Sequence, residues 1–433
     1  MQNSSIFTTI SDPLKRFIPI SKQEIITDLQ AATHWQKEDK KKFETFCTIF
    51  MALYHFKFHA HLEKLKHSYA PFSPNEDTYS LKQVTAEEKQ QKHTILIAAI
   101  HQLLNAANYE QLPIDNINEA MQETSPYGLE VAVDLEEFSD ILLYYRGLAN
   151  QTVKKRTWRS LFLKEETFET PIYRRLFFLL KFKTEAQRIQ ELMAQDQDLT
   201  EEKARKQVQK AREALPCGSI QGEKIFLKLF QDIPRHDIEM LFPNQRVRLP
   251  LFDKINLAIT GGGGTIGGII TTAGKIAVAA NPFAIIMAFI GLVAIIFRQI
   301  MNIFNRRNKY MMTLAQRLYF YNLNNNSGVF SYLIDHAEEE ECKEAILAYY
   351  FLHCFPEKCY TQDILDQDIQ AYIQKQYGIT IDFEVADALR KLREEGLLIE
   401  QEDGTLQVVD LQIANEYLDK QWDNFFRPAQ TKT

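Results

Sequence analysis

Hydrophobic residues in the first half of the chain recur mostly with the period of an α-helix. Phe46, Phe50 and Leu53 follow a spacing of about 3.6 residues, and the pattern stops at Pro71. The stretch "TILIAAIHQLLNAANYEQL" is a second amphipathic segment. The alternating "LEVAV" predicts a short strand before another helix. We therefore expect residues 1–215 to form a mostly helical N-terminal region.

The most distinctive hydropathy pattern is a pair of uncharged runs in the second half of the chain. Residues 255–274 and 276–297 contain no charged side chain, and Lys275 lies between them. A helix of about 20 apolar residues can cross a bilayer, so the runs predict a Gly-rich transmembrane hairpin over residues 255–298. The second run is the stronger, because the first contains seven glycines, and a single span is the alternative.

Basic residues flank the predicted hairpin on both sides, so the positive-inside rule places both soluble parts and both termini on the cytoplasmic side. The expected location is an integral, two-span membrane protein. The membrane would be the plasma membrane in a prokaryote and a mitochondrial membrane in a eukaryote.

The C-terminal part has the pattern of a small α+β domain. Residues 216–254 form a predicted juxtamembrane block, and residues 305–433 an acidic C-terminal domain. Two helical patterns there precede two short apolar runs around Asp403-Gly404, which is a strong hairpin signal. Two helices and a hairpin are the outline of a winged helix. The predicted fold class is a mainly α membrane protein with a helical N-terminal region, a transmembrane helical hairpin and a small winged-helix-like α+β C-terminal domain.

Charge and cysteine content narrow the classes of function. The chain carries a net charge of −7, and residues 311–433 contain 22 acidic against 10 basic side chains. Such an acidic part repels phosphate backbones, so we expect no nucleic-acid partner. The five cysteines are odd in number and scattered, which is typical of a reducing compartment.

The glycine stretch "AITGGGGTIGGII" raises the question of a dinucleotide cofactor, since Gly262 begins a G-x-G-x-x-G spacing. A dinucleotide loop needs an acidic residue about 20 positions later, and the following 30 residues contain none. We therefore predict no cofactor. Glycines four residues apart allow close helix packing in lipid, which assigns a packing role to Gly263, Gly264, Gly267 and Gly268.

The block "DIPRHDIEMLFP" and the basic residues after it are the predicted contact site for a headgroup or partner. The candidates are Asp232, His236, Arg246, Arg248 and Lys254. The alternative, which we favour for this block, is a structural cap that fixes the depth of the hairpin. No nucleophile motif is present, so we assign no catalytic residue.

Two titratable clusters have metal-like spacing but favour simpler interpretations. His55, His59 and Glu63 recur every four residues, without the H-E-x-x-H arrangement of a zinc protease. Residues 338–341 are four consecutive glutamates, for which a solvated or docking acidic face is favoured over a cation site. We therefore assign no metal ligand.

The chain resembles the membrane proteins related to transmembrane protein 143, classed as domain of unknown function 3754. The resemblance is carried by "RFIPI", "YHFKFHAHLEKLKHSYAPFSP", "LFQDIPRHDIEMLFPNQRVRLPLFDK" and "DHAEEEECKEAILAYYFL". It implies a membrane protein, mitochondrial in animal members, with soluble parts on both sides of the hairpin in sequence. It implies no established activity and no catalytic residues.

These patterns favour a non-enzymatic, membrane-anchored adaptor or regulatory protein. Its expected partners are the lipid bilayer and a protein, or a second copy that packs through the glycine faces. The alternative is a membrane-bound enzyme or lipid-headgroup-binding protein with Asp232, His236 and Arg246 in its site. A channel-like component is less favoured, because the predicted spans contain no charge.

Overall fold

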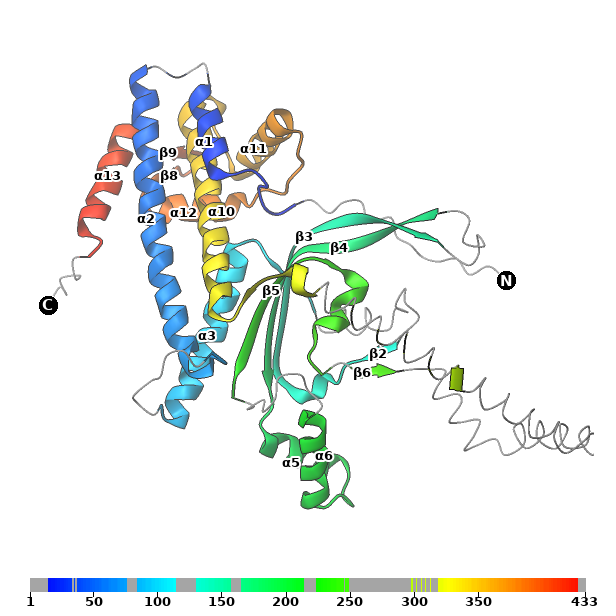
Figure 1. Ribbon diagram of the computed structural model, residues 1–433. Helices are drawn as coiled ribbons and strands as arrows, with labels where there is room; N and C mark the ends of the chain where they lie inside the picture. Colours follow the sequence, from blue (N-terminus) through cyan, green and yellow to red (C-terminus); the bar gives the residue numbers. More distant parts are fainter. Residues whose placement is uncertain are drawn as a thin grey trace, which may run out of the picture.

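In a computed structural model, the chain forms two packed layers (Figure 1). One layer is a group of helices and the other is an antiparallel sheet. The described residues are 15–32, 35, 37–75, 84–113, 130–156, 165–213, 223–244, 246–248, 297–298, 301, 305, 308, 312 and 318–426.

Long helices form the first layer. In Figure 1, α2 (Lys37–Tyr69) and α10 (Ser327–Cys354) lie side by side, with α13 (Leu411–Asn424) against the outer side of α2. As predicted, α2 ends just before Pro71, which enters the short 3₁₀ helix η1 (Ala70–Phe72). The layer is completed by α1 (Lys22–Ala31), α3 (Ala86–Ala106), α11 (Gln362–Tyr377), the 3₁₀ helix η5 (Pro356–Lys358) and α12 (Val385–Glu394).

Local sequence explains where these helices begin. Thr85 and Glu88 form a capping box at α3, in which each side chain accepts a hydrogen bond from the other residue's backbone N–H. Ser21 and Thr361 accept hydrogen bonds at the starts of α1 and α11. Each cap satisfies backbone donors that have no partner within the helix.

The second layer is a five-stranded antiparallel sheet in the order β1-β3-β4-β5-β7. Successive side chains of a strand point to opposite faces. Phe177 and Leu179 therefore pack against the helices, while Leu176 and Phe178 pack on the far face with the 3₁₀ helix η4 (Arg235–Leu241). The strands are β1 (Glu110–Gln111), β3 (Phe138–Arg156), β4 (Glu165–Phe182), β5 (Ile225–Pro234) and β7 (Asn322–Asn325).

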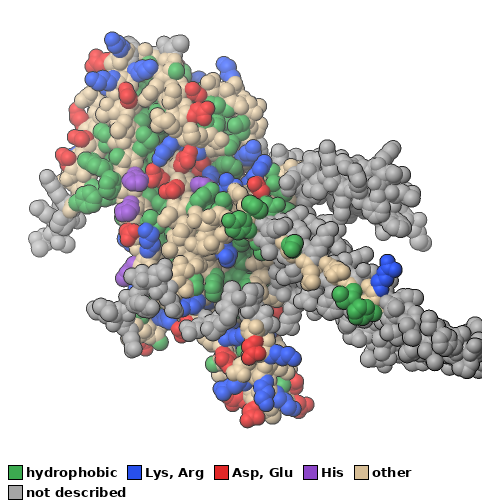
Figure 2. All heavy atoms as spheres, in the orientation of Figure 1, with side chains coloured by type: hydrophobic (Ala, Val, Ile, Leu, Met, Phe, Trp, Pro, Cys, Tyr) green, Lys and Arg blue, Asp and Glu red, His purple; other side chains and the backbone are tan. Residues whose placement is uncertain are grey.

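Smaller elements surround the sheet. The helices α5 (Glu185–Gln195) and α6 (Glu201–Glu213) project from it and carry exposed charges of both signs (Figures 1 and 2). The 3₁₀ helix η2 (Leu135–Glu137) precedes β3, and the pair β2 (Glu130–Ala132) and β6 (Arg246–Arg248) is a separate two-stranded ribbon.

The predicted mainly α fold class is wrong. The short strand expected at "LEVAV" is present as β2, but a helix was expected after it and the chain instead forms β3, β4 and β5. The run "LFFLL" in β4 is buried on both faces of the sheet. A strand covered on both sides loses the alternating pattern that distinguishes it from a buried helix.

The membrane-protein part of the fold class and the integral-membrane location are also corrected. Of the helices in the described residues, none combines the length and the apolar character that crossing a membrane requires. The predicted hairpin, including Gly263, Gly264, Gly267 and Gly268, lies outside the described residues except for residues 297–298.

The C-terminal helices and hairpin have the predicted order. After α11 and α12, β8 (Leu398–Glu400) pairs antiparallel with β9 (Leu406–Val408) around Gly404, which has a φ of 82°. This positive φ suits glycine, which has no Cβ. The buried Leu411 and Leu418 of α13 belong to the same hydrophobic cluster as Phe46 of α2. The C-terminal part therefore packs directly on the N-terminal helices.

Candidate functional site: a cleft beside a buried charge network

Five charged residues of α10 are buried at the centre of the molecule. The glutamates 338–341 therefore do not form a solvated acidic face, the first of our two expectations, because three of the four are buried. Burying a carboxylate is costly unless a cation and hydrogen bonds compensate it. The five buried residues are Glu338, Glu340, Glu341, Lys343 and Glu344.

Glu340 and Lys343 hold the N-terminal segment, residues 15–22, against α10. One carboxylate oxygen of Glu340 accepts hydrogen bonds from Arg146 of β3 at 2.6 Å and from Lys343 at 2.6 Å, and the other accepts from the backbone N–H of Ile18 at 3.0 Å. Lys343 also donates to the carbonyls of Ile18 at 2.6 Å and Ile20 at 3.1 Å. This group joins the sheet and the N-terminal segment to one helix.

Lys391 of α12 lies in a second buried group. Its Nζ is 2.5 Å from Glu344, 3.0 Å from Asp387 and 3.6 Å from Glu341. Burial alone would lower the pKa of Lys391, but the three carboxylates outweigh burial and raise it. The other carboxylate oxygen of Glu344 accepts a hydrogen bond from Asn108 at 2.9 Å. These contacts fix α12 to α10 and to the end of α3.

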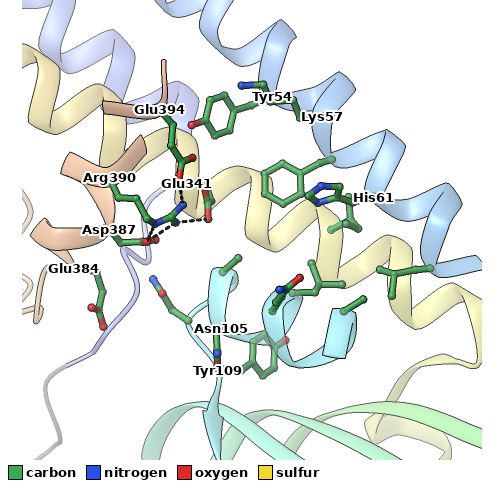
Figure 3. A pocket seen from close by; sticks show the side chains of 18 of the residues that line it. Tyr54, Lys57, His61, Asn105, Tyr109, Glu341, Glu384, Asp387, Arg390 and Glu394 are labelled. Atoms are coloured by element: carbon green, nitrogen blue, oxygen red, sulfur yellow. Dashed lines mark hydrogen bonds and ion pairs between the residues drawn. The ribbon is translucent and has the colours of Figure 1, made fainter. Parts of the chain in front are cut away.

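An open cleft of about 990 Å³ lies next to these groups, between α2, α3, α10 and α12. Its volume is at the upper end of the range for pockets that hold small molecules. Figure 3 shows Tyr54, Glu341, Arg390 and Glu394 gathered at one end, with His61 farther along α2. Residues far apart in sequence meet there, which makes the cleft the best candidate for a functional site.

Glu341 is the buried carboxylate of α10 that lines the cleft. Its nearest cations are Lys391 at 3.6 Å and Arg390 at 3.9 Å, and no described side chain donates a hydrogen bond to it. Burial raises its pKa to about 7, although Lys391 opposes the change. The group can therefore take up or release a proton near neutral pH.

Tyr54 of α2 faces the same end of the cleft. Its side chain is 5% exposed, and its hydroxyl has no hydrogen-bond partner among the described residues. Burial, and next the carboxylates of Glu395 and Glu341, raise the pKa of Tyr54, so the hydroxyl keeps its proton. A hydroxyl that faces the cleft without a protein partner is available to a bound molecule.

The rim of the cleft is formed largely by ion pairs. Arg390 pairs with Asp387 at 2.9 Å and with Glu394 at 2.8 Å, and these contacts are drawn in Figure 3. Lys57 of α2 pairs with Glu395 beyond the end of α12. In each pair the two charges compensate each other within the protein, and the Lys57–Glu395 pair connects α2 to the end of α12.

The structure does not bring the predicted contact residues together at this cleft. Asp232 lies in β5, where it pairs with Arg174 at 3.1 Å and has a φ of 50°. The backbones of Arg246 and Arg248 pair with β2, and His236 lies in η4, with no side-chain placement described for these three residues. Lys254 lies outside the described residues.

The histidines of α2 also take simple positions. His55 lies 2.9 Å from Glu338, and its side chain is 62% exposed. His59 and Glu63 are exposed. Within the part of the chain that the structure describes, no group of three or more His, Cys, Asp or Glu side chains is placed to hold a metal ion.

The cleft could not be predicted from local sequence patterns, because its lining comes from residues 16 to 395. One signal was present: Tyr54, Lys57, His61 and Lys64 follow one another at three- or four-residue spacing, so they share one side of a helix. That pattern indicates a polar side of α2, but only the tertiary structure supplies the facing walls.

Part of the chain matches the model of a known family. A family model described as "Protein of unknown function (DUF3754)" matches residues 138–328. The match runs from β3 to the first residues of α10, and so comprises most of the sheet with α5, α6 and η4. The residues that line the cleft lie outside it. No solved structure matches the chain significantly. The narrower likeness to transmembrane protein 143 stays a prediction.

Proposed function

Because residues 138–328 belong to the DUF3754 family, whose function is unknown, we propose a function from the cleft beside them. The protein is a non-enzymatic regulatory or adaptor protein that binds a small polar molecule between α2 and α12. The observation that carries the proposal is the cleft itself, where the largely buried residues Glu341 and Tyr54 present polar groups that have no hydrogen-bond partner in the described part of the chain.

Regulation follows from how the wall of the cleft is attached. Lys391 joins α12 to α10, and Lys57 joins the chain after α12 to α2. A molecule that contacts Glu341 and Arg390 therefore touches both sides of the contact between α10 and α12. If it binds one arrangement of α12 more tightly than another, it shifts the position of the C-terminal helices.

A ligand screen that compares the wild type with a variant whose cleft is blocked tests this function. The wild-type protein is heated with a panel of amino acids, short peptides, polyamines, nucleotides and sugar phosphates, and its Tm is recorded. Ala99 of α3 lines the cleft, whereas its neighbour Ala98 is exposed and does not. We expect a compound that raises the Tm of the wild type and of Ala98→Trp, but not of Ala99→Trp. Equal stabilisation of both tryptophan variants would contradict binding in the cleft.

A second candidate is an enzyme, and one observation favours it. A carboxyl group with a pKa near 7 is suited to general acid–base catalysis at neutral pH, and Glu341 has this property inside the cleft. The two functions differ in the fate of the ligand. A compound that stabilises the protein is incubated with it and followed by mass spectrometry. Chemical conversion that is lost in Glu341→Gln would favour the enzyme, and recovery of the intact compound would favour the regulator.

A further inference from the structure

The two ends of the cleft differ in charge. At the end near α12, the carboxylates of Glu341, Asp387 and Glu394 line the wall (Figure 3). Farther along α2 the titratable groups are His61 and Lys64. The cleft is therefore acidic at one end, and Lys64 carries a positive charge at the other.

Once the internal ion pairs are counted, one charged group at each end of the cleft lacks a close partner. Arg390 is occupied by Asp387 and Glu394, and Lys57 by Glu395. Glu341 has cations only at 3.6 and 3.9 Å, and no hydrogen bond from a described residue. Lys64 is exposed and makes no hydrogen bond or ion pair within the described part of the chain.

The wall between these two ends is mainly apolar. It is formed by side chains of α2 and α3, among them Phe58, Leu65, Ile95, Ala99 and Leu103. Ile95 is 51% exposed although it is a large hydrophobic residue. A molecule that covers it gains hydrophobic stabilisation in addition to contacts at its ends.

From this arrangement we propose that the cleft binds a short zwitterionic chain, with a primary amine at Glu341 and an anionic group at Lys64. The proposal rests on the ligand-binding function proposed above and names the class of ligand. An ammonium group has three donors and no acceptor. The carboxylate of Glu341 and the oxygen of the Tyr54 hydroxyl are acceptors at the same end, and both lack close partners.

Helix geometry gives the length of this ligand. Tyr54 and Lys64 are ten residues apart on α2, which is about 15 Å along the helix axis. An extended chain spans about 3.3–3.6 Å per residue, so a tetrapeptide of about 13–14 Å reaches from one end to the other. Its anionic end would then lie near Lys64, with His61 beside it.

Tetra-alanine and its two capped forms test the assignment of the ends. N-acetylation removes the positive charge, and C-terminal amidation removes the negative one, while the chain between them stays the same. Binding of each peptide to the full-length protein is measured by isothermal titration calorimetry. A charge-assisted contact accounts for about a ten- to hundred-fold change in Kd. We expect either cap to weaken binding by that factor.

Variants then connect each end of the peptide to its residue. Glu341→Gln keeps the shape of the side chain, and Lys64→Gln removes one exposed charge. We expect Glu341→Gln to weaken tetra-alanine about as much as N-acetylation does, with no further loss when both changes are combined. Lys64→Gln should weaken binding about as much as amidation does, with no further loss when both changes are combined. Glu339→Gln and Lys66→Gln are matched controls from the same helices, because neither residue lines the cleft.

The outcomes separate the ligand class from the function. The assignment of both ends is supported if tetra-alanine binds and each cap stops changing the Kd only in one variant. N-acetylation should have no further effect in Glu341→Gln, and amidation none in Lys64→Gln. If another compound stabilises the wild type but not Ala99→Trp, and tetra-alanine does not bind, the ligand class is overturned and the binding function stands. If tetra-alanine binds but capping has no effect, the end assignment is wrong. If no compound distinguishes Ala99→Trp from Ala98→Trp, both proposals fail.

Discussion

Replacing Lys391 with methionine should be among the most destabilising single changes in the C-terminal helices. The side chain is fully buried, with carboxylates at 2.5, 3.0 and 3.6 Å from its Nζ. Methionine fills similar space but leaves Glu344 and Glu341 buried without their main cation. Removing one partner of a buried ion pair costs about 3–5 kcal/mol, and three affected carboxylates place Lys391→Met at the upper end of that range.

The free energy of unfolding of the same variant should depend more strongly on pH than that of the wild type. Burial holds the pKa of Glu341 at about 7 in the folded protein, above the ordinary value of 4.5. A raised carboxyl pKa means that the folded state binds the extra proton, so stability is lost as pH rises from 4.5 through 7. Without Lys391 the pKa values of Glu341 and Glu344 rise further. Each additional pKa unit adds about 1.4 kcal/mol to the difference between low and high pH.

Chemical denaturation at two pH values measures both effects. The free energy of unfolding of the wild type, Lys391→Met and Lys375→Met is determined with urea at pH 5 and pH 8. Lys375 is an exposed lysine of α11, so its variant controls for loss of charge. The deficit of Lys391→Met should be at least about 1 kcal/mol larger at pH 8 than at pH 5. A deficit below about 1 kcal/mol at pH 8, or one independent of pH, would refute the buried charge network.

Two further predictions concern packing and thiol access. Gly147 has a φ of 76°, and a Cβ there would lie 3.1 Å from the ring of Phe17. Gly404 has a φ of 82° and open space around it, so Gly147→Ala should lower the Tm more than Gly404→Ala. Equal losses of Tm would mean that the N-terminal segment does not pack on β3. Burial raises the pKa of Cys342 to about 12 and also raises that of Cys47, while Cys359 is exposed. Iodoacetamide labelling, resolved by peptide, should modify Cys359 in the native protein and Cys342 and Cys47 only after unfolding. Fast labelling of Cys342 in the native protein would contradict the packing of α10.

The sequence predicted helices better than strands for a physical reason. The end of α2 at Pro71 and the hairpin at Asp403-Gly404 depend on local chemistry that the sequence displays directly. The strand β4 depends on its neighbours, because Leu176 and Phe177 become buried on opposite faces only when β3 and β5 lie beside them and both faces are covered. The cleft likewise requires α2 and α12 to meet, which no local pattern encodes.

The glutamates of α10 show why a charge run alone does not predict exposure. Glu338 is compensated by Lys22 at 2.8 Å, Glu340 by Arg146 at 2.6 Å, and Glu344 by Lys391. These cations come from the N-terminal segment, β3 and α12, so the run looks solvated until the fold brings them together. Glu341 differs, because it is as buried as Glu338 but its cations, Lys391 and Arg390, lie at 3.6 and 3.9 Å without a hydrogen bond. A stabilising role does not explain a costly carboxylate left without close partners. Its position on the cleft wall does, if a ligand supplies a cation closer than Lys391 and Arg390.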